Sequence, residues 1–167
     1  MPNIDLFIPE GALATEAEQS LIAELTTIVL RNEGADPNNE LVRSIAWISL
    51  HRPQVYVAGR PADDAPRYRI YAAAPEGQFT PERRQAMVTE ITNAVLDAEN
   101  GSYLRDPQRV WVFTPSIPEG TWGAGGSIVH LADIISFTVG DPQLGQKIAA
   151  KALARSRAAD AWGKRRS

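Results

Sequence analysis

Residues 2–11 read PNIDLFIPEG, and residues 68–77 read YRIYAAAPEG. Both stretches end in PEG, 66 residues apart, and the similarity between them continues along the chain without a gap. When Pro2–Gly59 is matched with Tyr68–Gly125, 14 of the 58 pairs are identical, including Glu33 with Glu99 and Arg43 with Arg109. Self-similarity at a fixed separation indicates that the chain contains two copies of one structural unit.

Each copy has the pattern of a strand, a helix and a second strand. The first strands are predicted at 3–8 and 69–74, and the second strands at 44–50 and 109–114. Apolar residues at spacings of three and four predict an amphipathic helix between them. In the first copy they are Leu21, Ile22, Leu25, Ile28 and Val29, and in the second Met87, Val88, Ile91, Ala94 and Val95. Thr80 followed by Pro81 is a typical helix start.

Two strands joined through a helix of this length favour a parallel pair with a right-handed crossover. The sequence therefore predicts an α/β (α+β) fold in which two tandem β-α-β units form a four-stranded mixed sheet with two helices on one face. Residues 130–137 (HLADIISF) predict one further strand, and residues 141–162 predict a helix that covers an edge or packs across a neighbour.

The repeats also suggest how the chain is divided. We expect one domain over residues 1–140, made of repeats 2–59 and 68–126 and joined by a linker at 58–69. Residues 141–167 then form a C-terminal helix and a short basic tail.

Composition excludes several classes of function. The chain of 167 residues has no cysteine, so it has neither disulfides nor a thiol nucleophile, and its formal net charge of −3 gives no general attraction to nucleic acid. No apolar run approaches the ~20 residues needed to span a bilayer, and the N-terminal residues lack the basic and apolar regions typical of a signal peptide. The two histidines, His51 and His130, are too few and too scattered for a metal site. We therefore expect a cytoplasmic protein without metal or cofactor, and without a nucleic-acid or membrane partner.

Pro2 stands at the head of the first strand and is the first candidate for chemistry. If Met1 is removed, Pro2 becomes a free secondary amine, and an exposed α-amino group has a pKa of about 7.7–8.0. Desolvation lowers this pKa, and an amine near neutrality can remove a proton from a carbon beside a carbonyl and return it elsewhere. In a chain that retains Met1 this nitrogen is an amide and has no such role, and Pro2 then only restricts the backbone.

The combination of Pro2, the EG turn, the helix and the Gly-rich end of the second unit resembles the tautomerase superfamily. WGAGG at 122–126 is similar to the aromatic-Gly-x-Gly-Gly segment of 4-oxalocrotonate tautomerase-like chains, and Arg109 stands upstream of it much as the family's strand arginine does. Two fused units with one N-terminal proline are similar to the longer members, which include the macrophage migration inhibitory factor, malonate semialdehyde decarboxylase and cis-3-chloroacrylic acid dehalogenase groups. The resemblance spans about residues 2–126 and implies a homotrimer.

The resemblance also implies a set of site residues. Pro2, Arg109 and Arg43 are the candidate catalytic residues, since an arginine can hold the developing oxyanion or a substrate carboxylate, from a neighbouring chain if necessary. Trp122 matches the aromatic wall of the family's site, and Trp111 and Phe113 lie on the strand that lends side chains to an adjacent site. The alternatives are a surface role for each arginine and core or interface packing for each aromatic residue.

The chain departs from the family at the turns. Ala12 and Gln78 stand where the family has an arginine one residue past the EG turn, and Pro75 and Val29 replace an arginine and a histidine of the dehalogenase group. Because these carboxylate-binding residues are missing, we expect a tautomerase that moves a keto–enol proton on a small 2-oxo acid or phenylpyruvate-like substrate, with Pro2 as general base. The alternatives are a hydratase, dehalogenase or decarboxylase of a small unsaturated or oxo acid, or a non-catalytic trimer that binds a ligand.

Overall fold

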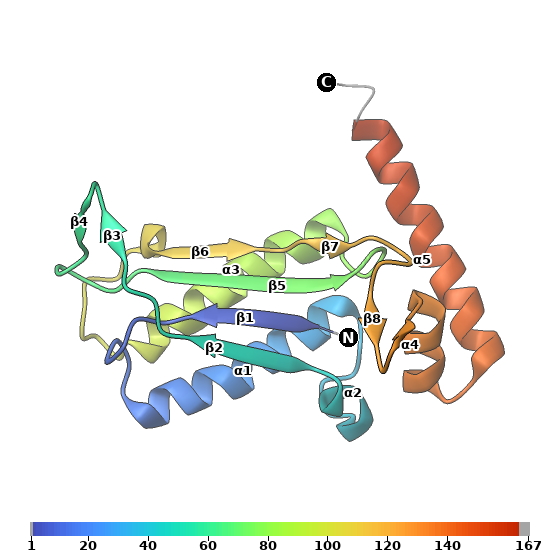
Figure 1. Cartoon of the computed structure of the whole chain (residues 1–167), viewed down its shortest axis with the longest axis horizontal. Coiled ribbons are helices and arrows are strands. Elements are labelled where there is room, and N and C mark those ends of the chain that lie inside the picture. The colour runs from blue at the N-terminus through green and yellow to red at the C-terminus, as the bar shows by residue number, and fades with distance from the viewer. Residues whose placement is uncertain (1, 164–167) are drawn as a thin grey trace.

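The two copies of the repeat form one mixed sheet with two long helices on one face (Figure 1). The computed structural model describes residues 2–163. The first unit contains β1 (Asn3–Phe7), α1 (Thr15–Glu33), α2 (Glu40–Ser44) and β2 (Trp47–His51). The second unit contains β5 (Tyr68–Pro75), α3 (Pro81–Ala98), the short 3-10 helix η1 (Pro107–Arg109), β6 (Val110–Phe113) and β7 (Ser116–Ile117).

The strand order is β2-β1-β5-β6, and β7 pairs with the end of β5. Strand β1 runs parallel to β2, β5 runs parallel to β6, and the two central strands β1 and β5 are antiparallel. The predicted four-stranded mixed sheet with two helices on one face is confirmed.

Buried apolar residues alternate with more exposed residues along the central strands, so one face of this sheet is buried. Ile4 and Leu6 of β1 and Ile70 of β5 are buried in a core that Leu25 of α1 and Ile91 of α3 complete. Helix α3 begins as predicted, because the Thr80 hydroxyl accepts a hydrogen bond from the Arg83 N–H at 3.2 Å. The two units therefore share one hydrophobic core between the sheet and the helix pair.

The opposite face of the sheet is open and carries aromatic side chains. The rings of Phe7 and His51 stack with centroids 4.3 Å apart, and those of Tyr71 and Phe113 stack at 4.6 Å. Trp47 and Trp111 lie on the same face and are 72% and 63% exposed. We call this surface the open sheet face.

The register of the strands corrects the ungapped match between the units. Asn3 pairs with Trp47, whereas its counterpart Arg69 pairs with Trp111. Trp47 therefore corresponds to Trp111, not to Phe113, since the connection from helix to strand is two residues shorter in the second unit. For the same reason Arg43 and Arg109 do not occupy equivalent positions.

Short hairpins and a pair of helices complete the fold. The linker carries β3 (Tyr56–Val57) and β4 (Arg60–Pro61), and the WGAGG segment forms a hairpin of β8 (Gly123–Ala124) and β9 (Ser127–Ile128). Two helices, α4 (Leu131–Val139) and α5 (Pro142–Gly163), then pack against each other beside the end of the sheet (Figure 1). None of the helices within residues 2–163 combines the length and the apolar character that a membrane crossing requires.

The strand predicted at 130–137 is wrong, because this segment is helix α4. The Asp133 carboxylate accepts a hydrogen bond from the His130 N–H at 2.9 Å, and Gly140 ends the helix in the left-handed conformation. Leu131, Ile134 and Ile135 are buried, and their spacing of three and four is that of a helix.

The helix predicted at 141–162 is confirmed as α5. Its backbone packs directly on the PEG turn of the second unit, where the Arg155 Nη2 donates to the Gly77 carbonyl at 3.0 Å. The boundary drawn at residue 140 falls in the turn between α4 and α5, and the basic residues 164–167 lie outside the described part of the chain.

Candidate functional site

Pro2 lies buried at the start of the central strand β1. Its carbonyl accepts a hydrogen bond from the Trp47 N–H at 3.2 Å, and the next residue, Asn3, pairs with β2 on one side and β5 on the other. Pro2 is thereby held where the sheet meets the hairpin β8–β9 and the helix α4. Removal of Met1 falls outside the described residues and stays a prediction.

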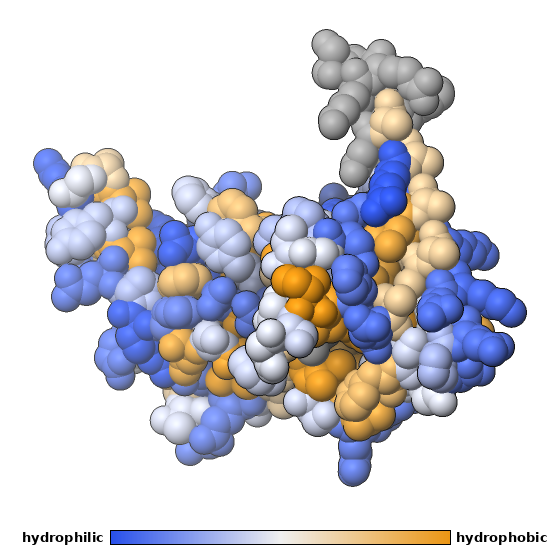
Figure 2. Space-filling view, turned by 45° about the vertical axis from the view of Figure 1, so that its right-hand side comes forward, coloured by the Kyte–Doolittle hydropathy of each residue, from blue (hydrophilic) through white to orange (hydrophobic). Residues whose placement is uncertain are grey.

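An open cleft of about 610 Å³ lies on one side of Pro2. We call it the tryptophan cleft, since Trp47 and Trp122 form its aromatic walls. Its other lining residues are Asn3, Ser44, Ile45, Ala73, Ile117, Thr121, Gly123, Ala124 and Gly125. The structure brings Pro2 and Trp122 to one cleft, and none of the described residues that line it is charged. Figure 2 shows hydrophobic residues gathered on this side of the molecule, with hydrophilic residues around them.

A second, small cavity of about 30 Å³ also borders Pro2, and we call it the Pro2 cavity. Its only charged lining residue, within the described chain, is Glu33, which is the last residue of α1 and is 5% exposed. Burial raises the pKa of the Glu33 carboxyl to about 7. Sequence reasoning missed Glu33 as a functional candidate, although its identity with Glu99 in the repeat was a signal.

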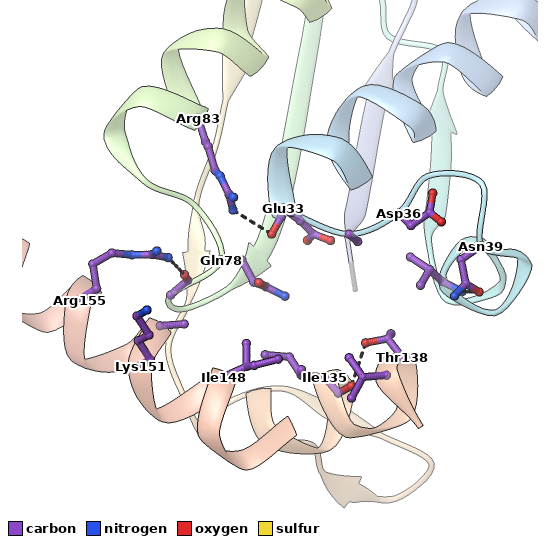
Figure 3. A pocket seen from close by; sticks show the side chains of 16 residues that line it. Glu33, Asp36, Asn39, Gln78, Arg83, Ile135, Thr138, Ile148, Lys151 and Arg155 are labelled. Atoms are coloured by element: carbon purple, nitrogen blue, oxygen red, sulfur yellow. Dashed lines mark hydrogen bonds between the residues drawn. The ribbon is translucent and has the colours of Figure 1, made fainter. Parts of the chain in front are cut away.

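A third space, an open cleft of about 530 Å³, lies between the end of α1, the turn after β5 and the helices α4 and α5 (Figure 3). We call it the basic cleft because Arg83, Lys151 and Arg155 line it, together with Glu33 and Asp36. It shares six lining residues with the Pro2 cavity, which are Glu33, Ala35, Val42, Gln78, Ile135 and Thr138. The basic cleft and the Pro2 cavity are therefore adjacent.

Arg109 lies at the other end of the sheet from Pro2, beside Tyr68. It is 4% exposed, and its guanidinium donates to both oxygens of Glu99 at 2.5 and 2.6 Å and to the carbonyls of Pro66 and Leu104. Hydrogen bonding to Glu99 raises the pKa of Arg109 further. Within one chain this arrangement favours a structural role for Arg109.

The remaining predicted residues also lie away from Pro2 within the chain. Arg43, on α2, donates to the Pro37 carbonyl at 3.0 Å and to the Thr27 hydroxyl at 3.4 Å, which ties the loop after α1 to that helix. Trp111 and Phe113 point from β6 onto the open sheet face, where they are 63% and 40% exposed. The structure thus unites Pro2 and Trp122 and leaves the other four residues elsewhere.

Glu99 is the counterpart of Glu33 in the second unit, and the surroundings of the two carboxyl groups can be compared. Tyr68 stands in the place of Pro2, and its hydroxyl donates to Glu99 at 2.9 Å. Arg109, which completes that cluster, corresponds to Ile45 after the two-residue difference in loop length is allowed for. One end of the sheet thus holds a buried ion pair, and the equivalent end holds Glu33 beside Pro2.

Comparison by sequence finds no match, either to a family model or to a curated protein. By structure, the chain is similar to several solved structures. A fused 4-OT trimer structure matches with a TM-score of 0.61 and 21% identity, covering 75% of this chain and 94% of that one. Pt0534, inactivated by 2-oxo-3-pentynoate, matches at 0.61 and 20% over 75% and 95% of the two chains.

A macrophage migration inhibitory factor from Toxoplasma gondii matches with a TM-score of 0.57 and 15% identity, over 76% of this chain and 99% of that one. The chain therefore has the fold of the tautomerase superfamily. A quarter of the chain lies outside these matches. The helices α4 and α5 are the part that the two-unit pattern does not account for.

Proposed function

We propose that this protein is a tautomerase in which the free amine of Pro2 moves a proton between the keto and enol forms of a small 2-oxo acid or phenylpyruvate-like substrate. The observation that supports it is the position of Pro2, which is buried at the head of the central strand between the tryptophan cleft and the Pro2 cavity. An amine in this place meets a substrate while it is shielded from bulk water.

Two effects would change the pKa of the Pro2 amine in opposite directions. Burial disfavours the charged ammonium and lowers the pKa of the amine, whereas a carboxylate beside it stabilises the ammonium and raises that pKa. Glu33 shares the Pro2 cavity, and its counterpart Glu99 accepts a hydrogen bond from the residue in the place of Pro2. We infer that Glu33 stabilises the ammonium formed after Pro2 takes the substrate's proton, and that Trp122 covers the reacting carbon.

The test compares the turnover of phenylenolpyruvate by the wild type and by Pro2→Ala. Pro2→Ala still presents a primary α-amine once Met1 is removed, so this variant should be slower than the wild type but keep part of the general-base rate. A chain extended before Pro2 is the stricter test, because its Pro2 nitrogen is an amide and cannot act as a base. General-base catalysis contributes 10²–10⁴-fold in rate, so the extended chain should be at least about a hundredfold slower. Intact mass should show that Met1 is absent from the active protein. Equal rates in the wild type and the extended chain would exclude the proline mechanism.

2-Oxo-3-pentynoate, the compound that inactivated Pt0534, offers an independent test of the amine. Addition of the Pro2 nitrogen across the carbon–carbon triple bond, with its proton passing to the neighbouring carbon, attaches the whole reagent without a leaving group. The mass of the N-terminal peptide should increase by that of the reagent in the wild type and stay unchanged in the extended chain.

Hydration of a small unsaturated acid is the second candidate, and Glu33 is the observation that favours it. A carboxylate beside the amine keeps it protonated, and a protonated amine can donate a proton while water adds to a double bond. A rate that falls as the pH rises past the pKa of the amine would favour hydration. A rate that increases over the same range would favour the general base.

We propose a homotrimer in which the open sheet face meets other copies of the chain. The fused 4-OT structures are trimers, and the exposed tryptophans of this face support a similar assembly here. A role of Arg43, Arg109, Trp111 or Phe113 in a neighbouring chain's site stays a prediction, as do the cytoplasmic location and the division of the chain at residue 140.

A further inference from the structure

The basic cleft has a charged rim and an apolar floor. Arg83 from α3 and Lys151 and Arg155 from α5 supply its positive charges, and Val42, Ile135 and Ile148 supply apolar surface. Figure 3 shows Ile148 and Ile135 to one side of the three cations. A space of about 530 Å³ is within the size range of small-molecule sites. The cleft therefore combines the two features that an amphipathic organic anion requires.

The cations of this cleft remain available to a ligand. Arg83 donates to the Glu33 main-chain carbonyl at 3.2 Å and Arg155 donates to that of Gly77 at 3.0 Å, so these hydrogen bonds go to neutral groups. Hydrogen bonds to the Glu82 carboxylate lower its pKa, and Arg155 lowers that pKa further by a charge interaction at longer range. Among the side chains that the structure describes, no carboxylate lies within 4.0 Å of Arg83, Lys151 or Arg155 as an ion pair. The exposed Lys151 side chain rises from α5 into the cleft, towards the wall that carries Glu33 and Arg83 (Figure 3).

The basic cleft is also the charged space next to Pro2. The tryptophan cleft has no charged residue among its described lining, so it offers a carboxylate no cation. The basic cleft shares six lining residues with the Pro2 cavity, and the uncharged side chains of Gln78 and Thr138 are among those between them. A carboxylate held on α5 would therefore lie on the side of Pro2 where the chain supplies positive charge.

We propose that the basic cleft binds the carboxylate of an organic acid through Lys151 and Arg155, with the apolar body of the acid over Ile135 and Ile148. This inference rests on the proposed function, for which it supplies a carboxylate subsite on the helix that follows the two repeats. In this proposal, Lys151 and Arg155 would bind the carboxylate in a chain that has Ala12 and Gln78 instead of arginines after its two EG turns. The ligand class is a monocarboxylate with an aryl or branched alkyl body.

The test measures the binding of 3-phenylpropanoate by isothermal titration calorimetry on the full-length protein. This acid has no 2-oxo group, so it cannot undergo the keto–enol reaction. Hydrogen bonds to charged groups contribute enough that Lys151→Gln should weaken binding about tenfold. Lys147→Gln is the matched control, because Lys147 lies one turn earlier on the same exposed helix and does not line the cleft. The neutral analogue 3-phenylpropanamide should bind at least tenfold more weakly than the acid.

Three outcomes would overturn the proposal: equal binding of acid and amide, equal losses in the two lysine variants, or no saturable binding of the acid at millimolar concentration. Both substitutions are on an exposed helix surface, so circular dichroism should show the folded protein in each case. Pro2→Ala should bind 3-phenylpropanoate like the wild type. A loss of turnover with binding intact, or the reverse, therefore separates a failure of the proline mechanism from a failure of this subsite.

Discussion

Glu33 and Glu99 show how one residue acquires different chemistry in two copies of the same unit. Both are buried near the end of the long helix of their unit, at 5% and 3% exposure. Glu99 is balanced by Arg109 and the Tyr68 hydroxyl, and burial raises the pKa of that phenol well above its usual range. Glu33 lies instead beside Pro2, which borders the tryptophan cleft and the Pro2 cavity.

The raised pKa of Glu33 makes stability depend on pH. Between the ordinary carboxyl pKa of 4.5 and about 7, the folded chain holds a proton that the unfolded chain has released, so stability falls as the pH rises through this window. The full difference is about 3 kcal/mol. Burial is the larger influence on the pKa of Glu33, and the N-terminal amine of the chain opposes it by lowering that pKa. Arg83, which donates to the Glu33 carbonyl, and Lys151 and Arg155 across the basic cleft are the other cations nearby.

Glu33→Gln should remove this part of the pH dependence, because an amide does not ionise. Urea unfolding at pH 5, 6, 7 and 8 should show a free energy of unfolding that declines with pH in the wild type and is flatter in the variant. Curves that stay parallel across this range would contradict the raised pKa of Glu33.

At the scale of elements, the repeat and the spacing of apolar residues are enough to predict most of the long helices and strands. The two long helices, the first strands and the C-terminal helix were identified because each has a regular pattern or a clear start signal. From sequence alone, residues 130–137 are expected to form a strand, since a short apolar run such as IISF fits the period of a strand as well as that of a helix. The structure resolves it as α4 through the Asp133 cap, the Gly140 terminus and the contact with α5, which lies beyond the segment itself.

The crossing of α4 and α5 depends on Gly145. A Cβ at this position would lie 2.6 Å from the Ser136 backbone nitrogen and Cα, so Gly145→Ala requires the two helices to separate. Overpacking of this kind costs about 1–3 kcal/mol, and we expect the variant to be less stable by that amount in urea unfolding.

The sign of the stability change in Gly145→Ala distinguishes close packing of α4 on α5 from the local helix propensity of alanine. Alanine in place of glycine inside an exposed helix is worth about 1 kcal/mol of added stability, so an increase would show that the helices do not meet closely. Ala150→Met serves as the control, because it enlarges an exposed side chain in the middle of the same helix and should leave stability nearly unchanged.

At the scale of the whole molecule, the open sheet face should decide assembly. Trp111→Glu places a charge where the proposed trimer buries an aromatic ring, so the trimer should dissociate to monomers at micromolar concentration in sedimentation equilibrium. Leu104→Glu is the matched control, since Leu104 is 87% exposed but lies in the loop before η1, away from this face. A trimer that persists in Trp111→Glu would place the interface elsewhere.

The candidate site could be predicted only in part. Pro2 and Trp122 can be identified from the sequence because one stands at the head of a strand and the other is the first residue of the recognisable WGAGG segment. The position of Arg109 was not, since it depends on a loop length that the ungapped repeat conceals and on Glu99 and Tyr68 from two other elements. Lys151 and Arg155 could not be linked to Pro2, because only the folded α5 brings them to its neighbourhood.

The shorter connection in the second unit has a consequence for how a duplicated chain can diverge. The connection between helix and strand is two residues shorter in the second unit and sets Arg109 against Glu99, while the longer connection in the first unit keeps Ile45 beside an accessible space next to Pro2. In a chain with two copies of one unit, such a small difference in spacing can give one half an anchoring role and leave the other half for chemistry. Transplanting the longer segment into the second half is therefore a route to a second reactive end in the same polypeptide.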